Sequence, residues 1–176
     1  MTRQTPSRAV LGLTNDTTPT LTPQDYIEIQ QLNACYAIYL DDCTDDGYAY
    51  ADLYTDDGTF GVSEKWGDPG ATYARTRDER AIVAGGGPHG RQPPRFGTSH
   101  HVIVNHRIEP RPGGAWGRCT LIAMKLDGDP ARNEPQGGYE DFYVKTADGW
   151  RFKSRVHVFP NIKSSLQFGP ESPYAL

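Results

Sequence analysis

The chain has 176 residues, of which 36% are hydrophobic and 23% charged, with a formal net charge of −4. This length is typical of one domain, and a mean hydropathy of −0.65 argues against a protein built from membrane-spanning helices, each of which needs about 20 apolar residues. The acidic balance also argues against nucleic acid as a partner, because phosphate backbones are bound by basic surfaces.

The two ends of the chain differ in composition from its middle. Residues 1–20 are rich in Thr, Pro and Asn and lack the continuous apolar stretch of a signal peptide, so we expect a flexible arm. Residues 21–165 are predicted to form the domain and residues 166–176 a tail. The three cysteines are an odd number and form no CxxC motif, which favours reduced thiols and a cytoplasmic location.

The first half of the domain has helical patterns. Thr22 is a suitable N-cap, Pro23 suits the first helical position, and Asp25 completes a capping box. A long helix is therefore predicted, ending within the stretch DDCTDDG, residues 41–47, where acidic residues crowd its C-terminus and Gly47 interrupts the pattern. A second helix is predicted over 48–55, then a turn over 56–58. One face of the long helix is apolar: Ile29, Leu32, Tyr36, Leu40 and Cys43.

The second half reads mainly as strands. After a strand over 59–66 and a short helix over 78–84, three stretches have strand-like composition or alternation, 99–110, 115–128 and 137–159. The last contains a hairpin turn at Asp148-Gly149. Helices followed by antiparallel strands indicate an α+β fold. We expect the long helix to cross the concave side of a strongly bent sheet, giving a cone that suits an apolar ligand.

Three of the five histidines lie in the stretch SHHVIVNHRIEP. Neighbouring residues of a strand point to opposite faces, so these histidines do not converge as a metal site, and no metal is predicted. One face is expected to line the cone, and the other to pack or meet solvent. The predicted faces are His101, Ile103, Asn105 and Arg107 on one side, and His100, Val102, Val104, His106 and Ile108 on the other.

Several segments resemble the SnoaL-like branch of the nuclear-transport-factor-2-like superfamily. They are YAIYLD, ADLYTDDGTF, SHHVIVNHRIE and GGYEDFYVKTADGWRFKSR, which together span about residues 22–158. The resemblance implies the cone-shaped fold and, within the superfamily, is strongest to scytalone dehydratase and bile-acid 7α-dehydratase. It implies a reaction without cofactor and, by analogy to those dehydratases, a homo-oligomer, with a trimer favoured over a dimer.

The resemblance also suggests site residues. Those dehydratases pair an Asp late in the first helix with a His on a central strand, and Asp41 and His101 fall on these positions, with Asn105 four residues after His101. Because the following linker is longer than usual, Asp42 is an alternative to Asp41. A carboxylate bonded to one imidazole nitrogen fixes the tautomer and makes the other nitrogen a better base.

Other residues are expected to hold the substrate. Tyr36 falls on a family Tyr position near Asp41, and its hydroxyl either binds substrate or belongs to the core. Tyr54 is a further phenol in the same region. On the last strand Arg155, where the family often has an Arg, and Lys153 are predicted to share the inner face and to stabilise an oxyanion. Lys153 is alternatively expected to form a Schiff base if it is desolvated. The alternative for each cation is a salt bridge to Glu140 or Asp141.

These residues predict a cofactor-independent lyase with an Asp–His general base, acting on a small apolar molecule, aromatic or polycyclic. Dehydration is the first expectation. Formaldehyde release from an aromatic diol and isomerisation would use the same base. A binding protein or an oxygenase β-subunit is the alternative without catalysis.

Overall fold

The computed structural model describes residues 19–90, 99–125 and 133–159. The predicted tail and nearly all of the predicted arm lie outside these residues. Helix α1 runs from Pro23 to Asp42 and begins with the expected capping box, in which the backbone N–H of Asp25 donates to the Thr22 hydroxyl at 3.2 Å. The helix ends where Cys43 adopts the left-handed conformation, with φ of 48°. The predicted start of α1 is confirmed, and its end at Asp42 lies within the predicted stretch 41–47.

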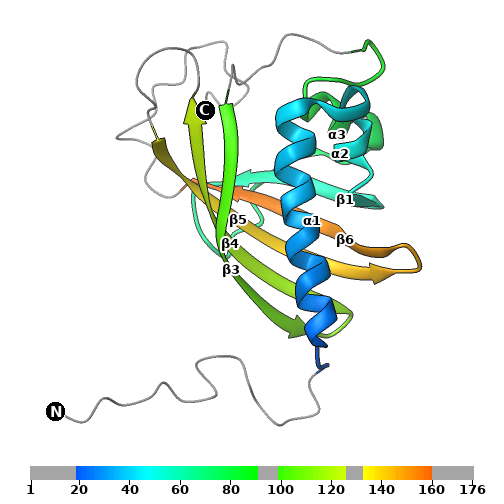
Figure 1. Ribbon diagram of the computed structural model, residues 1–176, viewed down its shortest axis with the longest axis vertical. Coiled ribbons are helices and arrows are strands. Elements are labelled where there is room, and N and C mark those ends of the chain that lie inside the picture. The colour runs from blue at the N-terminus through cyan, green and yellow to red at the C-terminus, as the bar shows by residue number, and fades with distance from the viewer. Residues whose placement is uncertain (1–18, 91–98, 126–132, 160–176) are drawn as a thin grey trace, which may run out of the picture.

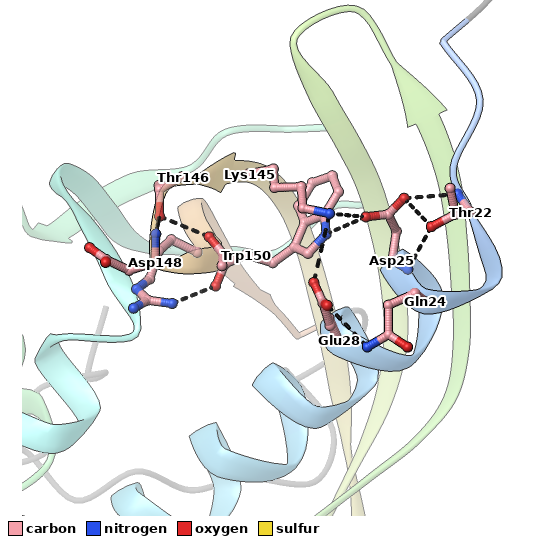
Figure 2. Close-up of polar contacts among 10 residues, drawn as sticks. Thr22, Gln24, Asp25, Glu28, Lys145, Thr146, Asp148 and Trp150 are labelled. Carbon is pink, nitrogen blue, oxygen red and sulfur yellow. Dashed lines mark hydrogen bonds and ion pairs between the residues drawn. The ribbon is translucent and has the colours of Figure 1, made fainter.

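Asp25 also fixes α1 to the sheet, as Figure 2 shows. One carboxylate oxygen accepts the backbone N–H of Thr22 at 2.8 Å, and the other lies 2.7 Å from Lys145 Nζ and accepts the indole N–H of Trp150 at 3.0 Å. The Lys145 and Thr22 contacts hold the pKa of the Asp25 carboxyl well below its usual range. The N-terminus of α1 is therefore bound to the hairpin near the C-terminal end of the domain that carries Lys145 and Trp150.

Replacing Asp25 with Ala is expected to lower the free energy of unfolding by about 2–3 kcal/mol, because it removes a helix cap and leaves the Trp150 N–H without its acceptor. Since the folded-state pKa of Asp25 is depressed, its contribution is present above the unfolded pKa near 3.8 and is lost as the pH falls below that value. Urea unfolding at several pH values measures both effects. Glu28→Ala, which removes a carboxylate 3.9 Å from Lys145, is the control and should change stability much less.

The segment after α1 differs from the prediction. A short 3₁₀ turn at Thr44–Gly47 leads into helix α2, Tyr48–Ala51, and strand β1 already begins at Tyr54. The predicted helix over 48–55 is therefore too long, and the turn predicted over 56–58 lies inside β1. The reason is an irregularity in β1, where Tyr54 and Thr59 pair with Phe152 and Ser154 and the residues between them are accommodated without ending the strand.

Six strands form one sheet in the order β2-β1-β6-β5-β4-β3, with β1 and β6 parallel and every other neighbouring pair antiparallel. The predicted hairpin at Asp148-Gly149 joins β5 to β6. The short edge strand β2 was not predicted. The remaining elements are β1 Tyr54–Ser63, β2 Ala71–Ala74, α3 Arg77–Val83, β3 Ser99–Arg111, β4 Gly114–Lys125, β5 Asn133–Thr146 and β6 Gly149–Val158.

Helix α1 lies across the curved sheet, and α2 and α3 lie beside its C-terminal end (Figure 1). The buried arginine Arg80 ties α3 to its neighbours by donating to the carbonyls of Gly58 at 2.6 Å and Ala51 at 3.3 Å. The core between α1 and the sheet is rich in aromatic rings, including Tyr36, Tyr50, Tyr139, Tyr143 and Phe152. The α+β cone-shaped fold predicted from the sequence is confirmed.

Two bulges change which residues face this core. In β3, Val104 and Arg107 pair with Thr120 and Arg118, so three steps on β3 oppose two on β4. Asn105 lies within this bulge with φ of 57°. Beyond a bulge the alternation is reversed, and Ile108 accordingly packs against the core on the same side as Ile103. The prediction that Ile103 and Ile108 lie on opposite faces is wrong.

The second bulge is in β6. Phe152 and Ser154 pair with Tyr143 and Phe142, so Lys153 is the extra residue. Phe152 and Arg155 are consequently both fully buried, although strict alternation had placed them on opposite faces. The predicted shared face of Lys153 and Arg155 is wrong for this reason.

Candidate active site

Asp41, in the last turn of α1, is bonded to His101 on β3. One carboxylate oxygen accepts the backbone N–H of His101 at 2.8 Å, and the other contacts the ring nitrogen Nδ1 of the same residue. Both side chains are largely buried, with 9% of Asp41 and 13% of His101 exposed. Of the two carboxylates considered, Asp41 is the one that meets His101, whereas Asp42 is exposed.

This contact has a defined chemical consequence. An Nδ1–H that donates to the carboxylate leaves the lone pair of Nε2 available to accept a proton. Because the same carboxylate also holds the His101 backbone, the ring is fixed in position as well as in tautomer. The pair can serve as a general base with little reorganisation.

His100 lies on the other side of the same carboxylate, with Nδ1 3.4 Å from Asp41 Oδ2. Its side chain is 56% exposed, which agrees with the expected outward direction. A solvated imidazole at this distance adds only a weak interaction.

Arg155 is the largest fully buried side chain among the described residues. Its guanidinium forms a two-point ion pair with Asp141, with Nε 2.8 Å and Nη2 3.0 Å from the two carboxylate oxygens. Nη2 also donates to the side-chain oxygen of Asn33 on α1 at 2.5 Å. The salt bridge to Asp141 that the sequence left as an alternative is therefore formed, and it occupies two of the three guanidinium nitrogens.

Tyr36 forms part of the aromatic wall around Arg155. The guanidinium carbon lies 3.9 Å from the ring centre of Tyr36, 4.0 Å from that of Tyr139 and 4.3 Å from that of Phe152. Burial raises the pKa of the Tyr36 phenol, so it stays protonated and can donate a hydrogen bond but not act as a base. Tyr36 thus belongs to the core. Its ring packs against Arg155, which together with Asp141 and Asn33 forms a buried polar cluster, called the polar interior below.

Two buried side-chain nitrogens lack a hydrogen-bond partner within the described ranges, Arg155 Nη1 and His106 Nε2. The β3 bulge directs His106 inward, in contrast to its predicted outward position. Burial, followed by the positive charge of Arg155, lowers the pKa of His106, so this imidazole is neutral near neutral pH. Apart from Asn105, a residue type that tolerates positive φ, the run VIVNHRIE carries no signature of a bulge, so strict alternation gave the wrong direction for His106.

The lowered pKa of His106 makes a prediction about stability. The unfolded chain takes up a proton near the ordinary value of 6.5, while the folded chain does so only at a lower pH. The contribution of His106 is therefore present above about 6.5 and is lost as the pH falls toward the folded-state pKa. In His106→Phe this part of the pH dependence should disappear from urea unfolding curves. His100→Phe, at an exposed histidine, should retain it.

Three other predicted residues lie in different surroundings. Tyr54 is buried, with its hydroxyl 3.1 Å from that of Tyr50, and so it joins the core network. Lys153 forms an ion pair with Asp57 in which both side chains are substantially exposed, and Asn105 is exposed in the β3 bulge. The bulges thus place Lys153 and Asn105 outside the interior, which removes the basis for their predicted substrate contacts.

The structure adds Asn33, Asp141 and Tyr143 to the polar interior. Tyr143 donates to Asp141 at 2.6 Å, and the amide nitrogen of Asn33 lies 3.0 Å from the Tyr143 hydroxyl. Asn33 sits on the apolar face of α1, between Ile29 and Tyr36, and a polar residue in that position is a sequence signal that was missed. Cys119 lies 3.9 Å from Arg155 Nη2, and burial raises the pKa of its thiol to about 12, so it is unsuited to act as a nucleophile.

Two features are absent from the part of the chain that the structure describes. No three His, Cys, Asp or Glu side chains converge there as a metal site. No helix there is long and apolar enough to cross a membrane.

Comparison with known proteins supports the fold over most of the chain. The family model described as SnoaL-like domain matches residues 22–156. No curated protein matches the chain significantly in sequence.

Solved structures match more widely. An NTF2-like protein with a cystatin-like fold from Novosphingobium aromaticivorans has 22% identity and a TM-score of 0.61, covering 82% of this chain and 90% of that one. ActVI-ORFA from Streptomyces coelicolor has 21% identity and a TM-score of 0.58, covering 74% and 93%. A protein from Catenulispora acidiphila, solved in complex with S-DNPA, has 22% identity and a TM-score of 0.56, covering 77% and 95%. At these identities the likeness concerns the fold alone.

Proposed function

The chain belongs to the SnoaL-like domain family, and from this premise we propose that it is a cofactor-independent lyase with His101 as general base and Asp41 as its orienting partner. The observation that carries the proposal is the two-point contact of Asp41 with the backbone N–H and Nδ1 of His101. A largely buried carboxylate that aligns one imidazole in this way is an arrangement typical of acid–base sites.

In the proposed reaction Nε2 of His101 removes a proton from a substrate carbon. The electrons of the broken C–H bond form a C=C bond, and the C–O bond to a hydroxyl group on the neighbouring carbon breaks. The protonated His101, stabilised by Asp41, returns the proton to the departing hydroxyl, which leaves as water. Arg155 Nη1 holds an oxygen of the substrate on which negative charge develops.

Two features support a small apolar substrate. The rings of Tyr36, Tyr139 and Phe152 pack against the Arg155 guanidinium, so the surroundings of Arg155 are aromatic and favour contact with a flat conjugated molecule. The charge of Arg155 is already balanced by Asp141, so the interior offers little net charge to attract an ion. The structural relative from Catenulispora acidiphila was solved in complex with S-DNPA, which is consistent with ligand binding by a protein of this fold.

The proposal is tested by incubating the purified protein, without added cofactor or metal, with pooled aromatic diols, hydroxyketones and polycyclic alcohols, and analysing the products by mass spectrometry. A product lighter by one water supports the dehydratase proposal. A product lighter by formaldehyde, or one of unchanged mass and altered retention, assigns the same base to a deformylating lyase or an isomerase. If all compounds are recovered unchanged, the catalytic proposal fails and a binding role takes its place.

Asp41→Asn serves as the site variant in this assay, with Asp42→Asn as its matched control. Both substitutions remove one negative charge from the same helix end. Because the amide introduced by Asp41→Asn would no longer orient the imidazole as a carboxylate does, turnover should fall by about 10²-fold or more in the first variant and change little in the second. Equal losses in the two variants would mean that the effect is only one of surface charge.

A further inference from the structure

We propose that His106 Nε2 and Arg155 Nη1 form a second polar pole of the interior, which binds an uncharged oxygen of the substrate, a phenolic or alcoholic hydroxyl or a ketone. This inference specifies the substrate class of the proposed lyase. A role of the two nitrogens in turnover rests on the lyase proposal, whereas their binding of an oxygen atom does not. The pole is distinct from the Asp41–His101 pair, since His106 lies five residues further along β3, within the bulge.

The two nitrogens belong to one region of the interior. Cys119 lies on β4 between Thr120 and Arg118, the two partners that flank the β3 bulge, and its sulfur is 3.9 Å from Arg155 Nη2. The guanidinium therefore extends across the sheet to the strand that neighbours His106. The effect of the Arg155 charge on His106 is an independent sign of this proximity.

Both nitrogens are shielded from solvent and have no partner among the described residues, although the other nitrogens of Arg155 are fully satisfied. Buried polar nitrogens without a hydrogen-bond partner are costly, and native structures rarely contain two in one place unless a bound molecule supplies the partner. An oxygen atom is the partner that both nitrogens require.

The charges select the kind of oxygen. Arg155 is already paired with Asp141, and His106 is held neutral by burial and by that guanidinium, so a carboxylate would enter without a balancing positive charge. A hydroxyl fits both groups, because its oxygen accepts from Arg155 Nη1 while its hydrogen is donated to His106 Nε2. A ketone oxygen fits as an acceptor from both when His106 carries its proton on Nε2.

The test compares three probes by isothermal titration near neutral pH: 2-naphthol, naphthalene and 2-naphthoate. We expect 2-naphthol to bind about tenfold more tightly than naphthalene, because its hydroxyl gains one hydrogen bond to Arg155 and one to His106, and more tightly than 2-naphthoate. In His106→Phe the preference for 2-naphthol over naphthalene should fall to about threefold or less. It should persist in Asn105→Gly, at an exposed position of the same bulge whose positive φ glycine adopts without strain.

A second measurement does not depend on a variant. In wild-type protein with ¹⁵N-labelled histidine, addition of 2-naphthol should shift the His106 Nε2 resonance, whereas naphthalene should leave it nearly unchanged. A preference that is unaffected by His106→Phe, tighter binding of 2-naphthoate, an unshifted Nε2 resonance, or no binding of any probe would overturn the inference.

The same probes separate this inference from the proposed function. His101→Gln should keep the preference for 2-naphthol, because His101 does not belong to this pole. If the wild-type protein shows the preference and yet converts no compound, the polar pole is supported and the lyase proposal fails. If it converts substrate without the preference, the lyase proposal is supported and the polar pole is overturned.

Discussion

Replacing His101 with Gln is expected to reduce kcat/KM of the proposed lyase by about 10²–10⁴-fold, the range typical of losing a general base. Glutamine retains a side-chain amide that can donate to Asp41 but offers no nitrogen basic enough to remove a proton from carbon. The loss should fall mainly on kcat, since the polar groups around Arg155 remain in place to bind substrate. Steady-state kinetics with the compound identified by mass spectrometry measures it.

His100→Gln is the matched control for this variant. His100 is adjacent in sequence and lies 3.4 Å from the same carboxylate, but its side chain is more than half exposed. The control should retain nearly full activity, and both variants should show the circular dichroism spectrum and thermal midpoint of a folded protein. Comparable activity in His101→Gln and wild type would show that another group removes the proton.

Replacing Arg155 with Met is expected to lower the free energy of unfolding by about 3–5 kcal/mol, because Asp141 would keep a buried carboxylate without its partner. The effect is larger than for most single substitutions, since the same side chain also contacts Asn33 and three aromatic rings. Urea unfolding followed by tryptophan fluorescence gives the value.

Two further variants make this result specific. Arg155→Met combined with Asp141→Leu removes both buried charges and should recover a large part of the lost stability. Lys153→Met, which breaks the exposed ion pair with Asp57 two residues away on the same strand, should change stability little. If the double variant is no more stable than Arg155→Met, unpaired charge is not the cause of the loss.

The sequence carried the information for the Asp41–His101 pair because each residue lies where local patterns are regular. The capping box at Thr22 and Asp25 fixes the start of α1, and the acidic stretch over 41–47 marks its end, so Asp41 falls in the last turn of the helix. His101 precedes the β3 bulge, so its face follows from simple alternation. The identity of the pair was supplied by the resemblance to known dehydratases, and the contact itself is given by the structure.

The prediction failed where the backbone departs from alternation. Each bulge adds one residue to a strand, and this inverted the predicted directions of His106 on β3 and of Arg155 relative to Lys153 on β6. Bulges depend on pairing with a neighbouring strand that is distant in sequence, so a single-strand pattern does not reveal them. Asn105, a residue type that tolerates positive φ, is the one local hint.

The bulges also imply that the chemistry of this interior can be altered by changing the length of a strand instead of its side chains. Deleting His106 from the β3 bulge would restore strict alternation and place Asn105 in the inward position opposite Cys119, whereas deleting Asn105 would keep His106 there; in both cases Arg107 would still pair with Arg118. Single-residue insertions and deletions at these two positions are therefore discrete steps between different interiors on one fold. Such changes in strand length offer a route by which relatives with similar sequences could acquire different substrates. They are also a simple means of redesigning the interior.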